Sequence, residues 1–189
     1  LIWLRRRDPE CDPVMFVLDL SKMYRSLPMQ ACRFHHYCYD HPGEGLMYDC
    51  FGPFGLAVIG HFAMYLSVGM TWAHRHVELP LLLPDGEPVP DYALNVFVDD
   101  FAGFVGRGNA PPVRQALVNV IRGVGFGFRG KLQDGIGASN PNLGVADEIR
   151  VWIGVRIDCA LSRARCTENL IGKCIGRIQD MLAADSPPT

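Results

Sequence analysis

Two apolar segments that lead into aspartates constrain this chain more than any other feature. Residues 14–18 form a continuous apolar run that ends at Asp19, and residues 93–97 form a second run that leads into Asp99 and Asp100. Residues 101–105 are apolar again, so the acidic pair is predicted at the tip of a β-hairpin. If both strands are neighbours in one sheet, their carboxylates repel one another. They can stay ionised and close together only with cations between them.

The aspartates have more than one interpretation when spacing alone is considered. Two Mg²⁺ ions held roughly 3.5–4 Å apart between carboxylates are a known arrangement for in-line displacement at phosphorus. An acidic pair after an apolar run is equally typical of a surface turn, and Asp19 could cap a helix. Both interpretations stay open at this point.

Composition excludes a few classes of protein. With 189 residues, 49% hydrophobic and 20% charged, the chain has an ordinary globular balance and enough length for one sizeable core or two small lobes. The net charge of -2 and the pI near 6.3 give no bulk support for nucleic-acid binding. Seven cysteines without a framework spacing favour reduced thiols, so we expect an intracellular protein, cytoplasmic or nuclear.

Two further expectations concern the context of the chain. No apolar run reaches the roughly 20 residues of a membrane span, so we expect no membrane partner. The chain opens at Leu1 without a methionine, and we expect it to be part of a longer polyprotein with other domains.

The remaining elements follow from periodicity and turn residues. A β-hairpin is predicted with arms at 33–39 and 46–51, and a mostly buried helix at 56–77. A proline-rich loop at 80–90 precedes the acidic hairpin. An amphipathic helix at 111–124, a strand at 149–157 and a last helix from Thr167 complete the chain.

The residues that flank the aspartates indicate a function more specifically than the spacing of the aspartates does. Asp19 stands in Phe16-Val17-Leu18-Asp19-Leu20-Ser21-Lys22-Met23-Tyr24-Arg25-Ser26-Leu27-Pro28, and the acidic pair in Phe97-Val98-Asp99-Asp100. The first segment resembles motif A of reverse transcriptases, and the second segment resembles their motif C. Between them, Gly52-Pro53-Phe54-Gly55-Leu56 resembles motif B.

Two later segments resemble the remaining motifs of the family. Gly125-Phe126 followed by Lys131 resembles motif D, and Trp152-Ile153-Gly154 resembles motif E, the primer grip. All five occur in the order of the family, from about residue 14 to residue 157. The Phe-Gly-Leu sequence in the segment that resembles motif B is similar to the motif B of retrotransposons of the long-terminal-repeat or tyrosine-recombinase kind.

The resemblance implies an α+β fold, with a polymerase palm-like antiparallel sheet backed by helices, a partial fingers hairpin and the start of a thumb. It divides the chain into an N-terminal segment with motif A (1–28), a partial fingers hairpin (29–51), a palm with motifs B to E (52–157) and the start of a thumb or connection helix (158–189).

The resemblance also implies an activity, RNA-directed DNA polymerase, a nucleotidyltransferase that adds deoxynucleotides to a primer 3′-hydroxyl. The partners are then an RNA or DNA template, a DNA primer and a dNTP. Two Mg²⁺ (or Mn²⁺) ions are the implied cofactors, with Asp19, Asp99 and Asp100 as catalytic metal ligands. Lys131 is the fourth implied catalytic residue, which protonates or neutralises the pyrophosphate, although it could equally be a solvated loop lysine.

Further residues acquire roles by the same resemblance. Leu20, Tyr24, Phe54 and Gly55 are the implied substrate-binding residues, with Tyr24 as the steric gate that excludes a 2′-hydroxyl. The alternative for Tyr24 is a packed core aromatic residue. The implied primer grip is Trp152, Ile153 and Gly154, or these residues simply fill the core beneath the primer.

Some positions depart from the family pattern. Gly52 stands where motif B has leucine, Gly60 where a proline follows, and the basic fingers segment before motif A is absent. An RNA-dependent RNA polymerase is a rival, but its motif A has a second aspartate at the position of Tyr24. A second rival is a degenerate palm kept for nucleic-acid or protein binding. The presence of all three carboxylates argues against this rival.

Overall fold

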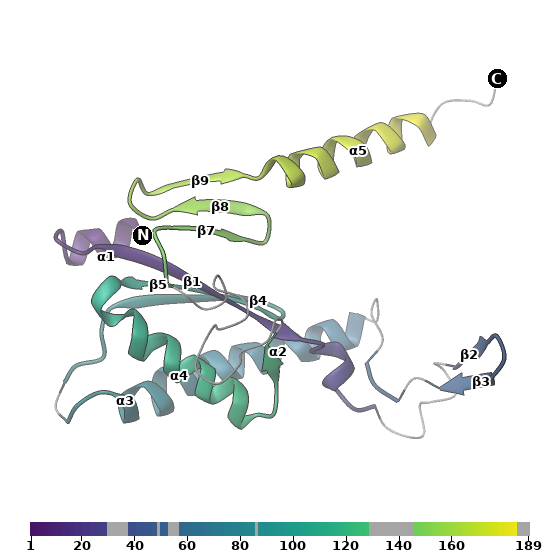
Figure 1. The fold of residues 1–189 in the computed structure, drawn as a ribbon, viewed down its shortest axis with the longest axis horizontal. Coiled ribbons are helices and arrows are strands. Elements are labelled where there is room, and N and C mark those ends of the chain that lie inside the picture. The colour runs from purple at the N-terminus through teal and green to yellow at the C-terminus, as the bar shows by residue number, and fades with distance from the viewer. Residues whose placement is uncertain (30–37, 49, 53–56, 86, 129–145, 185–189) are drawn as a thin grey trace.

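The computed structural model describes residues 1–29, 38–48, 50–52, 57–85, 87–128 and 146–184. Three layers are apparent in Figure 1, with a central sheet between a helical layer and a smaller three-stranded sheet. A β-hairpin and a C-terminal helix project from these layers.

The central sheet has four antiparallel strands in the order β4-β5-β1-β6. Its members are β1 (Pro13–Ser21), β4 (Tyr92–Phe97), β5 (Asp100–Gly106) and β6 (Gly127–Phe128). The predicted strand before Asp19 and the predicted hairpin around the acidic pair are therefore confirmed, and β1 lies directly beside β5.

Alternating side chains of the sheet pack into two separate cores on its two faces. For this reason the sequences of its strands are continuous apolar runs. On β1, Val14, Phe16, Leu18 and Leu20 point to the helical side, whereas Met15 and Val17 pack on the other side. The strands must be apolar on both faces because both faces are covered over most of their length.

The helical layer consists of α2 (Ala57–Ala73), a π-helical turn η3 (His74–Glu78), α3 (Leu79–Leu82) and α4 (Ala110–Gly123). The amphipathic helix predicted at 111–124 is confirmed, with Val113, Leu117 and Ile121 fully buried. The prediction of a mostly buried helix at 56–77 is wrong in one respect, because the outer face of α2 is exposed and apolar. That face carries Val58, Phe62, Tyr65, Val68 and Trp72.

A buried histidine joins this layer to the sheet. His74 Nε2 lies 2.8 Å from the carbonyl oxygen of Val113, and the Tyr92 hydroxyl lies 3.2 Å from His74 Nδ1. Because a carbonyl can only accept, Nε2 carries the proton and Nδ1 accepts from Tyr92. Burial lowers the pKa of His74 below its ordinary value, which keeps the ring neutral.

The opposite face of the sheet is covered by α1 (Ile2–Arg7) and by a second antiparallel sheet in the order β7-β8-β9. Its strands are β7 (Ile149–Trp152), β8 (Val155–Asp158) and β9 (Arg163–Cys166). The prediction of one strand at 149–157 is wrong, because the chain reverses at Ile153 and Gly154, both with positive φ (44° and 81°). Two consecutive residues with positive φ define the tight turn of a β-hairpin.

The other described elements lie at the periphery. They are η1 (Tyr24–Ser26), β2 (Cys38–His41), β3 (Gly45–Tyr48), η4 (Arg107–Asn109) and α5 (Glu168–Ala184). The expected hairpin is thus present as β2–β3, and residues 33–37 and 49 of its predicted arms lie outside the described residues. The fold class is confirmed as α+β, an antiparallel sheet backed by helices and compatible with a polymerase palm. Among the described residues, no helix has the length and apolar character needed to span a membrane.

Candidate active site

Asp19 and Asp100 are direct cross-strand partners in the register of β1 and β5. The next pair along, Leu20 and Asp99, is joined by a hydrogen bond of 3.0 Å from the Leu20 N–H to the Asp99 carbonyl oxygen. Directly opposed residues in an antiparallel pair point to the same face and have Cβ atoms roughly 4.5–5.5 Å apart. The sheet therefore brings two carboxylates together at the ends of its two central strands. The prediction that the Asp19 strand lies beside the acidic hairpin is confirmed, with Asp100 and not Asp99 as the direct partner of Asp19.

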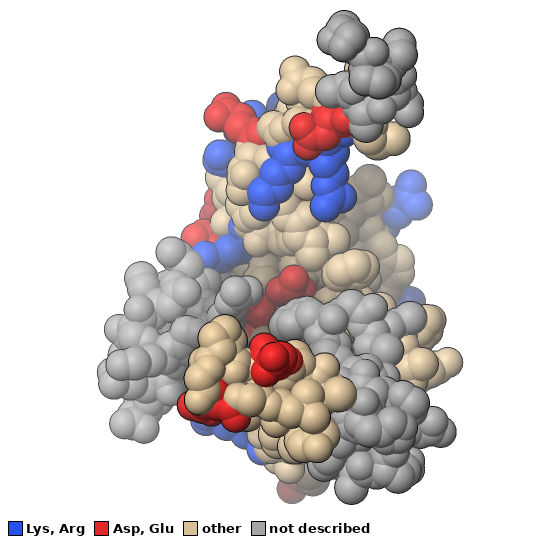
Figure 2. All heavy atoms as spheres, turned by 90° about the vertical axis from the view of Figure 1, so that its right-hand side faces the viewer, with Lys and Arg blue, Asp and Glu red and all other residues tan. Residues whose placement is uncertain are grey.

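Both carboxylates lie on the face away from the helices. Asp19 points to the same face as Met15 and Val17, which pack on the β7–β9 side. Asp100 points to that face too, together with Ala102 and Phe104. Asp19 and Asp100 remain only half-buried. Figure 2, which views the molecule from this end of the sheet, shows acidic side chains set back in the middle of the face.

Phe97 extends this row onto a third strand. It pairs with Asp100 across β4 and β5, and its side chain is 55% exposed. An exposed aromatic ring beside two carboxylates provides an apolar surface on which a base or sugar can pack. The resemblance to motif C includes this aromatic position, but the sequence did not single out Phe97 as a site residue.

Asp99 stands in the two-residue turn with Val98, which has a φ of 56°. A β-branched residue in the left-handed region costs on the order of 1–3 kcal/mol and persists only where its surroundings fix it. Ser67 of α2 supplies such a constraint, because its fully buried hydroxyl donates to the Val98 carbonyl oxygen. Sequence analysis missed Ser67, and the only available signal was a hydroxyl within an apolar helix.

The donor set suits a hard cation. Carboxylate oxygens are the ligands that Mg²⁺ prefers, and Mg²⁺ commonly takes one or two of them together with substrate phosphates. Asp19 and Asp100 supply such a pair, with Asp99 adjacent in the turn. Over the part of the chain that the structure describes, no three His, Cys, Asp or Glu side chains converge closely enough to form a complete metal site by themselves.

The segment that resembles motif A continues into η1, where Tyr24 is half-buried between the end of β1 and helix α2. A Cβ atom added at Gly60 of α2 would lie 3.7 Å from the Tyr24 hydroxyl, so motif A and the residue that replaces the motif B proline are neighbours. The Leu20 side chain is buried in the helical core. Its backbone N–H holds Asp99, as described above.

The residues that resemble motif E form the turn between β7 and β8. Trp152 is half-buried and packs against the core beneath β7–β9, whereas Ile153 is exposed at the tip. A Cβ atom added at Gly154 would lie 3.1 Å from Leu170 of α5, and the Gly154 carbonyl accepts from Thr167 N at 2.9 Å. The turn is therefore an exposed tip fixed from behind by the start of α5.

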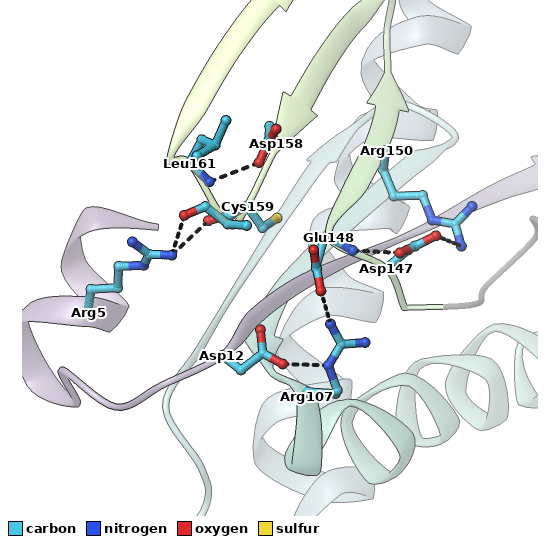
Figure 3. A network of polar contacts seen from close by, with 10 residues as sticks. Arg5, Asp12, Arg107, Asp147, Glu148, Arg150, Asp158, Cys159 and Leu161 are labelled. Carbon is cyan, nitrogen blue, oxygen red and sulfur yellow. Dashed lines mark hydrogen bonds and ion pairs between the residues drawn. The ribbon is translucent and has the colours of Figure 1, made fainter.

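The base of the second sheet is fastened to β1 and to the end of β5. Met15 and Asp147 exchange backbone hydrogen bonds of 2.8 and 3.0 Å. Figure 3 shows Arg107 between Asp12 and Glu148, with contacts of 2.5 and 2.7 Å. These contacts place β7–β9 over the sheet that carries the aspartates.

Near this contact Cys159 is fully buried. The backbone carbonyl oxygen of Glu148 accepts a hydrogen bond of 2.6 Å from the Cys159 N–H. Burial raises the pKa of the Cys159 thiol to about 11, so the group stays protonated and serves packing.

Three of the predicted site residues, Phe54, Gly55 and Lys131, lie outside the described residues. Their roles stay predictions.

Comparison with known proteins gives limited information. No family model matches the chain, and no curated protein matches it. One solved structure with a similar fold is the apo telomerase of Candida tropicalis truncated from its C-terminal domain, at 14% identity and a TM-score of 0.49. The match covers 87% of this chain and 37% of that one. At that identity and TM-score the likeness decides nothing about function.

Proposed function

We propose that this chain is the catalytic core of a reverse transcriptase, an RNA-directed DNA polymerase that adds deoxynucleotides to a primer 3′-hydroxyl. The observation that carries the proposal is the cross-strand pair of Asp19 and Asp100 at the open end of one sheet face, with Asp99 held beside it. Phosphoryl transfer leaves a protein little covalent work, so catalysis rests on positioning and charge. Carboxylates fixed by a paired strand and hairpin meet that need.

Asp19, Asp99 and Asp100 would hold two Mg²⁺ or Mn²⁺ ions. When bound, such ions supply positive charge that lowers the pKa of the attacking hydroxyl and neutralises the leaving pyrophosphate. The chain's own contribution is to orient its carboxylates. The Leu20 and Ser67 hydrogen bonds to the backbone of the turn support that orientation.

Tyr24 acts as the gate for the sugar in this proposal. Its half-buried position against α2 supports a fixed ring, because a ring packed on a helix cannot swing aside without losing that packing. A fixed ring would clash with a 2′-hydroxyl and select deoxynucleotides. Leu20 acts through its backbone N–H, which holds the turn of Asp99. Phe54 and Gly55 complete the nucleotide contacts in the proposal, and Lys131 serves the pyrophosphate.

The primer strand lies against Ile153 and Gly154, whose turn is exposed and backed by Leu170. Trp152 supports that turn from the core. The remaining proposed properties are an RNA or DNA template, an intracellular location and a longer retrotransposon-type polyprotein around this chain.

Primer extension tests the function directly. The 189-residue chain should extend a DNA primer on RNA and on DNA templates with dNTPs and Mg²⁺ or Mn²⁺. Tyr24→Ala should raise ribonucleotide incorporation relative to deoxynucleotide incorporation by at least about tenfold, the scale of one lost steric contact. Tyr24→Phe keeps the ring and should keep the discrimination. Absence of extension with either metal would overturn the proposal, and unchanged discrimination in an active Tyr24→Ala variant would remove Tyr24 from the gate.

A further inference from the structure

The outward face of the β7–β9 sheet carries three arginines. In the register of this sheet Val151, Arg156 and Arg165 form one cross-strand row, and Ile149, Asp158 and Arg163 form a parallel row. The alternate residues Trp152, Val155 and Ile157 pack into the core below. Arg156, Arg163 and Arg165 are consequently held on the exposed side, by the same alternation that buries their neighbours.

Three other arginines of the chain are compensated by carboxylates. Arg7 is paired with Asp91, Arg107 with Asp12 and Glu148, and Arg150 with Asp147. Over the described ranges, the guanidinium groups of Arg156, Arg163 and Arg165 are in no such pair.

Moreover, Arg156 is the direct cross-strand partner of Arg165. Like charges directly opposite each other destabilise a sheet. The one acidic residue of the two rows, Asp158, accepts a hydrogen bond of 2.8 Å from Leu161 N. Asp158 lies opposite Arg163, whereas the row of Val151, Arg156 and Arg165 contains no carboxylate. The repulsion between Arg156 and Arg165 within that row suits an anionic ligand.

The shape of this surface agrees with its charge. The three arginines line a shallow pocket of about 400 Å³ together with Asp158, Leu161 and Ala164. The Arg156–Arg165 row continues through Val151 to a second pocket at the Ile153–Gly154 turn, which Lys173 of α5 also lines. In Figure 2 most of the visible basic side chains lie in the upper part of the view, the part occupied by β7–β9 and α5.

We propose that Arg156, Arg163 and Arg165 bind the phosphate backbone of a nucleic-acid duplex, outside the candidate active site. The proposal rests on the proposed function, which supplies the duplex, but it assigns a separate surface. Guanidinium groups recognise phosphate oxygens in bidentate geometry, and a row of them on a rigid sheet tracks a backbone without reading sequence. Contact with several phosphates would neutralise the mutual repulsion of Arg156 and Arg165 on binding.

The test measures binding of a fluorescently labelled blunt RNA–DNA duplex to the full chain by anisotropy, over a series of salt concentrations. Arg156→Gln/Arg165→Gln should weaken binding at least about tenfold at 0.1 M salt and lower the steepness of the log K against log salt plot by about two. Arg122→Gln is the matched control, because this exposed arginine lies on α4, on the other side of the central sheet. Thermal stability of the double variant should be equal to or above that of the wild type, which shows that the fold is intact.

Other outcomes separate this surface from the catalytic proposal. If the wild-type chain binds the duplex through these arginines but does not extend the primer, the result upholds the arginine surface and counts against the polymerase. Equal affinity and equal salt dependence in Arg156→Gln/Arg165→Gln and Arg122→Gln would overturn the arginine surface, whatever the extension assay shows. Displacement of the duplex by poly-glutamate of matched charge at equal concentration would also overturn it, since the surface would then be a site for acidic peptides.

Discussion

Replacement of Gly103 by alanine should destabilise the sheet that carries the aspartates. A Cβ atom at Gly103 would lie 2.1 Å from Cζ and 2.3 Å from Cε1 of the fully buried Phe16 ring, far inside the roughly 3.5–4.0 Å of a carbon contact. Gly103 pairs with Phe16 on β1 and with Leu94 on β4, so its backbone is held on both sides. Overpacking of this kind costs about 1–3 kcal/mol, and we expect the upper part of that range.

A double-mutant cycle makes the magnitude testable. Phe16→Ala removes the ring and should cost about 3–5 kcal/mol. In Phe16→Ala/Gly103→Ala the new methyl group meets no ring, so the total should equal that of Phe16→Ala alone within about 0.5 kcal/mol. Urea unfolding followed by circular dichroism gives all three values. Gly108→Ala is the control, since a Cβ atom there meets nothing within 4 Å. Additive costs for Phe16→Ala and Gly103→Ala would refute the reasoning.

Two further predictions concern the buried polar groups. Because the pKa of His74 is lowered by burial, below pH 6.5 the unfolded chain takes up a proton that the folded protein does not. The free energy of unfolding should therefore fall as the pH drops below 6.5, by at most about 1.4 kcal/mol per pH unit, and this pH dependence should be weaker in His74→Gln. Ser67→Ala leaves the Val98 carbonyl without its donor and should cost about 1–3 kcal/mol in urea unfolding. Thr71→Ala, which removes only a bond to the Ser67 carbonyl in the same helix, should cost less, and equal losses would contradict the role of Ser67.

The parts of the fold that the sequence predicted are those with strong local signals. The runs before Asp19 and around Asp99 are apolar because each strand contributes to two cores, and their register follows from that alternation. The approach of the Asp19 strand to the acidic hairpin could therefore be expected from residue pattern and family resemblance together, whereas the direct pairing of Asp19 with Asp100 was not predicted.

The parts that sequence reasoning missed depend on long-range contacts. β9 (Arg163–Cys166) has no apolar pattern, since its four residues are exposed and only pairing with β8 defines it as a strand. The break at Ile153 was hidden because a β-branched residue rarely adopts positive φ, and here Leu170 and Thr167 hold the turn. Ser67 escaped notice because its acceptor, Val98, is 31 residues away.

The substitution Asp99→Asn tests the central claim most directly. Asparagine keeps the shape of the side chain but removes the negative charge that would help to hold a dication. Asp99→Asn should therefore lower primer extension on an RNA template by at least about a hundredfold, the scale of a lost electrostatic group in an active site. Its melting temperature without metal should stay level or rise, and the stabilisation gained on adding Mg²⁺ or Mn²⁺ should shrink. Asp85→Asn, at an exposed loop aspartate, should change none of these. Primer extension near the wild-type rate in Asp99→Asn would contradict the catalytic assignment.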